Sequence, residues 1–155
     1  MTDHQKLSFK AKLKNFALDL IGQRMTTAKD AMQQAQESAN SEEKSSAGDK
    51  YETGRAMGHL QKDMHARQLA ASAMELAALH AVNTESICPE GRIGAYLQTE
   101  DISFFISAGL GKQTIEGQTI LFLSPQAPLA KLLQGKKTGD TIVFDKRQLT
   151  IKTVF

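Results

Sequence analysis

The amino-acid sequence predicts an α+β protein in which an antiparallel hairpin of two long helices, residues 1–83, precedes a small antiparallel β domain with one short helix, residues 84–155. Residues before about 83 are rich in Ala, Gln, Lys, Met and Leu and contain no proline, a composition that favours long helices. Residues after that point are rich in Ile, Val, Phe, Thr and Gly, which is typical of strands and turns.

The first helix is predicted from apolar residues that recur at separations of mostly three and four, so that they line one helical face. We expect this helix over about residues 7–39, a length of about 50 Å at about 1.5 Å per residue. The predicted stripe consists of Leu7, Leu13, Phe16, Leu20, Ile21, Met25, Ala28, Met32 and Ala35.

The second helix follows a polar break over residues 38–49, in which no apolar residue is larger than alanine. Because neither helix buries its apolar stripe alone, we expect the two stripes to pack against each other as an antiparallel coiled coil. The stripe predicted for the second helix is Met57, Leu60, Met64, Ala71, Met74 and Ala78, widened by Leu69, Leu76 and Leu79.

The second half of the chain contains runs of β-branched and aromatic residues that read as strands over residues 92–98, 102–107, 118–124, 141–144 and 148–155. Turn residues separate these runs, and we expect residues 109–112 to form a hairpin turn. Two prolines and Gly135 bound a short helix at residues 127–134. The predicted aromatic core is Phe104, Phe105, Phe122 and Phe144.

Composition and charge exclude several classes of protein. The chain has 19 Lys and Arg residues and 17 Asp and Glu residues, which gives a net charge of +2. This small net charge does not indicate the strongly basic surface of a nucleic-acid-binding protein. No apolar stretch approaches the roughly 20 residues of a membrane span, and the N-terminus lacks a secretory signal. Cys88 is the single cysteine, which excludes an internal disulfide and a cysteine–zinc cluster. We therefore expect a soluble, cytoplasmic protein.

Five acidic residues and two lysines gather around the turn between the helices, where a long hairpin would present them to a partner. Carboxylates are suitable ligands for Mg²⁺, which commonly takes one or two from a protein and keeps several waters. The spacing of Asp49 and Glu52 also fits a capping box, in which both residues serve only to start the second helix. The acids are Glu37, Glu42, Glu43, Asp49 and Glu52, and the lysines are Lys44 and Lys50.

One segment near the C-terminus has a distinctive order of residues: Ser124-Pro-Gln-Ala-Pro-Leu-Ala-Lys-Leu-Leu-Gln-Gly-Lys-Lys-Thr-Gly-Asp140, followed by Thr-Ile-Val-Phe. This segment resembles the C-terminal signature of the bacterial Gre-type transcript-cleavage factors. The N-terminal hairpin is similar to the coiled coil of the same family in order and length. The resemblance implies that the second domain is FKBP-like and docks on bacterial RNA polymerase.

The same resemblance implies a role for the hairpin turn. Gly48-Asp-Lys-Tyr-Glu52 matches the family's Gly-Asp-x-x-Glu element, whose acids enter the secondary channel of RNA polymerase. There, Asp49 and Glu52 would help to hold the second catalytic Mg²⁺ and orient the water that cleaves backtracked RNA. The protein would then be a non-enzymatic, monomeric factor that stimulates the polymerase's own reaction and holds no stable Mg²⁺ alone. Lys44, Lys50 and Arg55 would contact the RNA 3′ end or the channel wall.

The turn departs from the family pattern in two respects, which keeps alternatives open. Glu52 is followed by Thr53-Gly-Arg55 where the family typically has Asn-Ala-Glu-Tyr, and the preceding loop is longer and richer in serine. Glu42 and Glu43 are therefore alternative working acids. A second reading is a channel binder that inhibits the polymerase without cleavage, and a third is a protein that dimerises through its helices.

Overall fold

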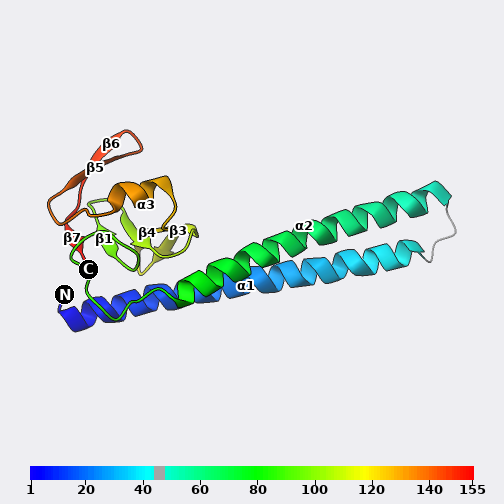
Figure 1. Ribbon diagram of the computed structural model, residues 1–155, viewed down its shortest axis with the longest axis horizontal. Helices are drawn as coiled ribbons and strands as arrows, with labels where there is room; N and C mark the ends of the chain where they lie inside the picture. Colours follow the sequence, from blue (N-terminus) through cyan, green and yellow to red (C-terminus); the bar gives the residue numbers. More distant parts are fainter. Residues whose placement is uncertain (44–47) are drawn as a thin grey trace. The chain divides into compact units, whose positions relative to one another are not determined.

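The computed structural model describes the backbone of residues 1–43 and 48–155 and the side chains of residues 1–41 and 56–155 (Figure 1). The chain is α+β, with two long helices followed by a small, mainly antiparallel sheet, as predicted. Its contacts define two compact units: unit 1 contains Met1–Leu18 and Ala77–Phe155, and unit 2 contains Asp19–Leu76. The boundary expected at residue 83 falls inside unit 1. No helix of the described part of the chain has an apolar stretch long enough to cross a membrane.

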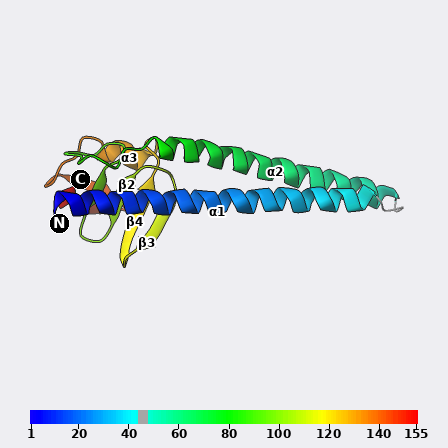
Figure 2. The ribbon, with the colours of Figure 1, turned by 90° about the horizontal axis from the view of Figure 1, so that it is seen from below.

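Unit 2 consists of parts of helices α1 (Asp3–Glu43) and α2 (Gly48–His80), which lie side by side and antiparallel (Figures 1 and 2). Helix α1 continues through residues 38–43, which we predicted as part of the polar break. This segment contains neither glycine nor proline, and side-chain hydrogen bonds one helical turn apart support it. Gln33 donates to Glu37 over 3.2 Å, and Gln36 donates to Asn40 over 3.0 Å.

The α1 side of the contact between the helices is the predicted stripe. Ile21, Ala28 and Ala35 are buried, and Ala39 continues the same face one turn further along the helix. Met25 and Met32 are half-buried between them. The prediction for this part of α1 is therefore confirmed.

The α2 side of the contact is only in part the predicted stripe. Leu69 and Leu76, which were expected to widen the stripe, are half-buried as predicted. The six other residues predicted for the stripe are exposed, and the four large ones among them are Met57 (51%), Leu60 (63%), Met64 (50%) and Met74 (76%). The half-buried or buried positions follow a second series with the same three-and-four spacing, which consists of Gly58, Lys62, His65, Leu69, Ser72 and Leu76. Each of two faces of α2 therefore has residues at this three-and-four spacing, and one of the two faces packs against α1.

Gly58 provides the physical reason for this choice of face. A Cβ atom added at Gly58 would lie 2.9 Å from Cβ of Ala39 and 3.2 Å from the carbonyl oxygen of Ala35, so the two backbones approach closely here. A methionine at this position would hold the helices apart. Lys62 Nζ also donates to Gln36 Oε1 across the contact, over 2.8 Å.

Unit 1 contains a five-stranded sheet in the order β3-β4-β2-β1-β7 and a separate two-stranded sheet of β5 and β6. The strands of the larger sheet pair antiparallel except for β2 and β4, which are parallel. The expectation of a wholly antiparallel sheet is therefore wrong at this one pair. The strands are β1 (Tyr96–Gln98), β2 (Ser103–Ile106), β3 (Gly111–Ile115), β4 (Gln118–Leu123), β5 (Thr141–Phe144), β6 (Arg147–Thr150) and β7 (Thr153–Val154).

Strand β3 replaces part of the turn predicted at residues 109–112. It forms a hairpin with β4 through Glu116 and Gly117, which both have positive φ (53° and 76°), as a two-residue turn of this type requires. Residues 111, 112 and 114 of β3 are exposed, so its sequence lacks the apolar alternation of a half-buried strand. The run predicted at 148–155 is also divided between β6 and β7.

The two faces of the larger sheet are covered by different elements of unit 1. On one face, Phe104 and Leu97 pack with Leu133 of α3 (Pro128–Leu133) and with the β5–β6 hairpin. On the other face, the first turns of α1 place Phe9 5.1 Å from the ring centroid of Tyr96, and Phe16 lies 5.9 Å from Phe122. This part of α1 is therefore an integral layer of unit 1 (Figure 2).

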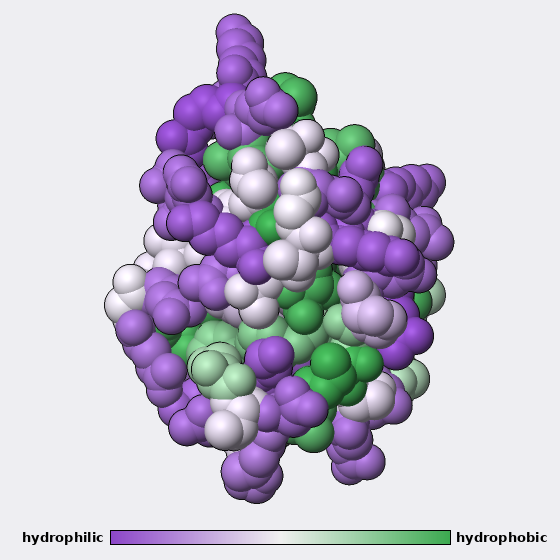
Figure 3. All heavy atoms as spheres, turned by 90° about the vertical axis from the view of Figure 1, so that its left-hand side faces the viewer, coloured by the Kyte–Doolittle hydropathy of each residue, from purple (hydrophilic) through white to green (hydrophobic). Residues whose placement is uncertain are grey.

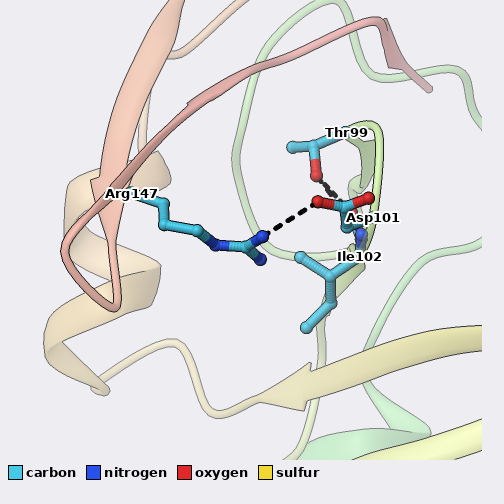
Figure 4. Close-up of polar contacts among 4 residues, drawn as sticks. All are labelled: Thr99, Asp101, Ile102 and Arg147. Atoms are coloured by element: carbon cyan, nitrogen blue, oxygen red, sulfur yellow. Dashed lines mark hydrogen bonds and ion pairs between the residues drawn. The ribbon is translucent and has the colours of Figure 1, made fainter.

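The β5–β6 hairpin is also joined to the turn after β1 (Figure 4). Arg147 Nη1 donates to Asp101 Oδ2 over 3.1 Å, and the Thr99 hydroxyl donates to the Ile102 carbonyl over 2.6 Å within that turn. Both charged side chains are 60% exposed, so solvent screening leaves this ion pair a small contribution to stability.

Candidate functional site

The acids and cations singled out in the sequence lie on the ends of two helices. Glu42 and Glu43 are the last two residues of α1, whereas Asp49, Lys50, Glu52 and Arg55 belong to the first eight residues of α2. Their side chains lie outside the described side chains, and Lys44 lies outside the described residues altogether. Helix α2 begins at Gly48, so Asp49 is in its first turn.

Helix α2 is the longer of the two at this end of unit 2. Gly58 lies against Ala39, and beyond this contact α1 has only residues 40–43, whereas α2 has residues 48–57. The difference of six residues corresponds to about 9 Å of helix. Asp49 and Glu52 belong to the part of α2 that extends further, and their separation of three residues places them on one helical face.

A shallow concave surface on α1 near this end is lined by Gln34, Glu37, Ser38 and Ser41, of which Glu37 is the charged member. Among the residues whose side chains are described, no three His, Cys, Asp or Glu side chains come together as a metal site. Two carboxylates on one helical face match the oxygen ligands that Mg²⁺ takes, but they leave most of its coordination to water or to a partner.

A buried polar cluster in unit 1 was not predicted from the sequence. Lys10 is fully buried, and its Nζ donates to the Ser86 carbonyl oxygen over 2.9 Å and contacts Cys88 Sγ at 3.6 Å. Arg92 Nε donates to the same sulfur over 3.4 Å. Lys10 lies three residues from both Leu7 and Leu13, which are apolar residues of the predicted stripe. This spacing would have placed Lys10 on the apolar face of α1.

Different causes shift the pKa values of the two basic residues in this cluster. Desolvation lowers the pKa of Lys10, and the opposing effect of Cys88 is smaller. The hydrogen bond to Cys88 raises the pKa of Arg92. Cys88 is 1% exposed. The cluster attaches the first turns of α1 to the segment before β1, and its chemistry is that of a buried anchor.

The aromatic residues of the sheet are core residues, as predicted. Phe104, Phe105 and Phe122 are at most 1% exposed, and Phe144 is half-buried with its ring 5.8 Å from that of Phe104. A cavity of about 340 Å³ in this unit has no aromatic lining; its walls are Arg92, Ile93, Ile106, Pro125, Ala130 and Gln134. Figure 3 shows a face of the protein on which polar side chains predominate and hydrophobic residues are exposed in small areas between them.

Comparison of the chain with protein-family models, with curated proteins and with solved structures finds no match.

Proposed function

We propose that the protein is a Gre-type transcription elongation factor, which inserts its hairpin into the secondary channel of bacterial RNA polymerase in the cytoplasm and stimulates cleavage of backtracked RNA. In this proposal unit 2 is a coiled coil, and the β domain is an FKBP-like module that docks at the channel rim. The observation that carries it is the unequal end of the helix pair, where the longer helix begins with Gly48-Asp-Lys-Tyr-Glu52.

The longer end of α2 favours Asp49 and Glu52 over Glu42 and Glu43 as the working acids. Counted from the Gly58–Ala39 contact, Asp49 lies about 7.5 Å further along the hairpin than Glu43, and Glu52 lies about 3 Å further. A carboxylate must lie within about 2–2.5 Å of a metal to bind it directly, so differences of this size affect which acids reach an ion beyond the end of the hairpin. Their position on one helical face lets both carboxylates approach one ion, although neither completes a site alone.

The proposed mechanism assigns the chemistry to the polymerase and the positioning to this chain. A second Mg²⁺ in the polymerase site would activate a water and stabilise the in-line displacement at the phosphodiester. Asp49 and Glu52 would supply oxygen ligands to that ion and accept a hydrogen bond from the attacking water. Lys50 and Arg55 would contact RNA phosphates or the channel wall, as would Lys44.

The test is a cleavage assay on stalled, backtracked complexes of bacterial RNA polymerase. The expected result is shortened RNA in the presence of the protein and Mg²⁺, with a loss of at least about 100-fold in cleavage rate for Asp49→Ala and Glu52→Ala, the range seen when one catalytic interaction is removed. Glu37→Ala is the matched control, since Glu37 lies on the same hairpin in α1 and has an exposed side chain. Loss of activity in Glu42→Ala or Glu43→Ala, with no loss in Asp49→Ala, would contradict the assignment of the acids.

The alternative function is a channel binder that inhibits the polymerase without cleavage. It is favoured by Thr53-Gly-Arg55 after Glu52, which departs from the pattern of cleaving factors. Intact transcripts with slowed synthesis, unaffected by Asp49→Ala, would support this alternative. Failure of the protein to bind polymerase at all would refute both functions.

A further inference from the structure

The outward face of α2 carries a row of large apolar side chains that no described part of unit 2 covers. We call Met57, Leu60, Met64, Ala71 and Met74 the outer stripe. Its four large members are between 50% and 76% exposed. Scattered single apolar residues are ordinary on protein surfaces, but a continuous row along one face of a helix marks an interaction surface.

The spacing of the outer stripe identifies a helix as the partner. Positions 57, 60, 64, 67, 71 and 74 alternate separations of three and four, which is the a and d pattern of a helix that packs along another helix. Arg67 is the one charged residue of this series. The stripe extends over 18 residues, about 27 Å at about 1.5 Å per residue, which suits a lengthwise contact between helices.

We infer that the partner is a second copy of this chain, packed antiparallel along the outer stripe. In this register Met57 lies opposite Met74 of the second copy, and Leu60 lies opposite Ala71, so that a large side chain meets a small one. Each contact occurs twice about a two-fold axis, as a closed dimer of identical chains requires.

Charge selects the antiparallel arrangement. Arg67 comes opposite Met64 of the second copy, beside Asp63, so two pairs of opposite charges form across the axis. A parallel dimer would instead place Arg67 directly against Arg67 of the second copy, with like charges in the seam. Both Asp63 and Arg67 are exposed in the single chain.

This dimer revises the monomer that we expected from the sequence. That expectation placed the stripe of α2 against α1, whereas the structure leaves it exposed. With four large side chains per copy, we expect the contact to be smaller than a standard interface of about 1,200–2,000 Å² and the dimer to be weak and reversible. The inference does not rest on the proposed function, because it uses only residues 57–74.

Sedimentation equilibrium of the full chain tests the dimer. The wild-type mass should rise from 17.0 kDa towards twice that value as its concentration increases from about 1 μM to about 1 mM. Leu60→Glu should raise the Kd at least about tenfold, because it places a charge in the centre of the contact. Ala73→Glu is the matched control: it adds the same charge at an exposed position of α2 outside the stripe. Because both positions are exposed, both variants should retain the wild-type circular dichroism spectrum.

Cysteine cross-linking tests the register. A mixture of the Met57→Cys and Met74→Cys variants should form a mixed disulfide, whereas Met57→Cys alone should not dimerise covalently. Arg67→Asp should weaken association, and the double variant Asp63→Arg, Arg67→Asp should restore it. Wild-type protein is the control for any cross-linking through Cys88, which is buried.

Three results would overturn the inference. The first is a wild-type chain that stays monomeric at all concentrations. The second is an equal effect of Leu60→Glu and Ala73→Glu on the Kd, and the third is a disulfide between two Met57→Cys chains. A monomer whose binding to polymerase is lost in Leu60→Glu would assign the outer stripe to the polymerase instead, while the cleavage assay with Asp49→Ala remains an independent test of the function.

Discussion

Replacing Gly58 and Gly22 by alanine, one at a time, tests how closely α1 and α2 are packed in unit 2. Both glycines lie inside long helices, where replacement of glycine by alanine stabilises the helix by about 0.8–1 kcal/mol. A Cβ atom at Gly22 meets nothing within 4 Å, whereas a Cβ atom at Gly58 lies 2.9 Å from Cβ of Ala39. The same substitution therefore has opposite consequences at the two sites.

The expected magnitudes follow from these distances. Gly22→Ala should raise the free energy of unfolding by about 0.5–1 kcal/mol. Gly58→Ala gains the same helical preference but adds an overpacking cost of about 1–3 kcal/mol, since neither Ala39 Cβ nor the Ala35 carbonyl can move without its backbone. The net effect should be a loss of about 0–2 kcal/mol.

Thermal and urea unfolding, followed by far-ultraviolet circular dichroism, would measure both changes. For a chain of this length, 1 kcal/mol shifts the Tm by about 2–4 °C. Gly22→Ala should raise the Tm, and Gly58→Ala should lower it or leave it unchanged. Adding Ala39→Gly to Gly58→Ala should recover about 0.5–1 kcal/mol as a coupling between the two positions. If Gly58→Ala raised the Tm as much as Gly22→Ala, the close helix contact would be refuted.

Three further predictions concern unit 1. Burial lowers the folded-state pKa of Lys10 below its unfolded value of about 10.4, so the cost of burying its charge is present at neutral pH and declines as the pH rises towards that value. Urea titrations should therefore show wild type gaining stability relative to Lys10→Met as the pH rises towards the unfolded pKa, and a constant difference would contradict this. Tyr96→Phe removes hydrogen bonds to Ser103 (2.9 Å) and Gln118 (3.1 Å), and should lower the unfolding free energy by about 1 kcal/mol. Phe9→Ala empties a buried site on the sheet and should cost about 3–5 kcal/mol, whereas a loss below about 1 kcal/mol would show that α1 does not pack there.

The sequence was sufficient to predict the elements that carry a strong period or a distinctive composition. The α1 stripe from Ile21 to Ala35, the α+β division of the chain and the short helix between its prolines and Gly135 are present in the structure. Strand β3 was missed because its residues are mostly exposed and polar, so they show no alternation. The roles of Asp49 and Glu52 remain predictions: the structure places both among the first five residues of α2 without describing their side chains.

Residue order alone predicted most of the helices and strands, because local preference and periodicity are properties of neighbouring residues. The tertiary structure decided which of two equally spaced faces of α2 packs against α1. Because Gly58 has no side chain, its backbone can lie close to Ala35 and Ala39, and this close contact is not visible in the sequence of α2. The tertiary structure also decided that β2 and β4 run parallel and that Lys10 is buried beside Cys88. A periodic pattern shows that a face is apolar, but the partner that covers the face is set by shape and distance between segments far apart in the chain.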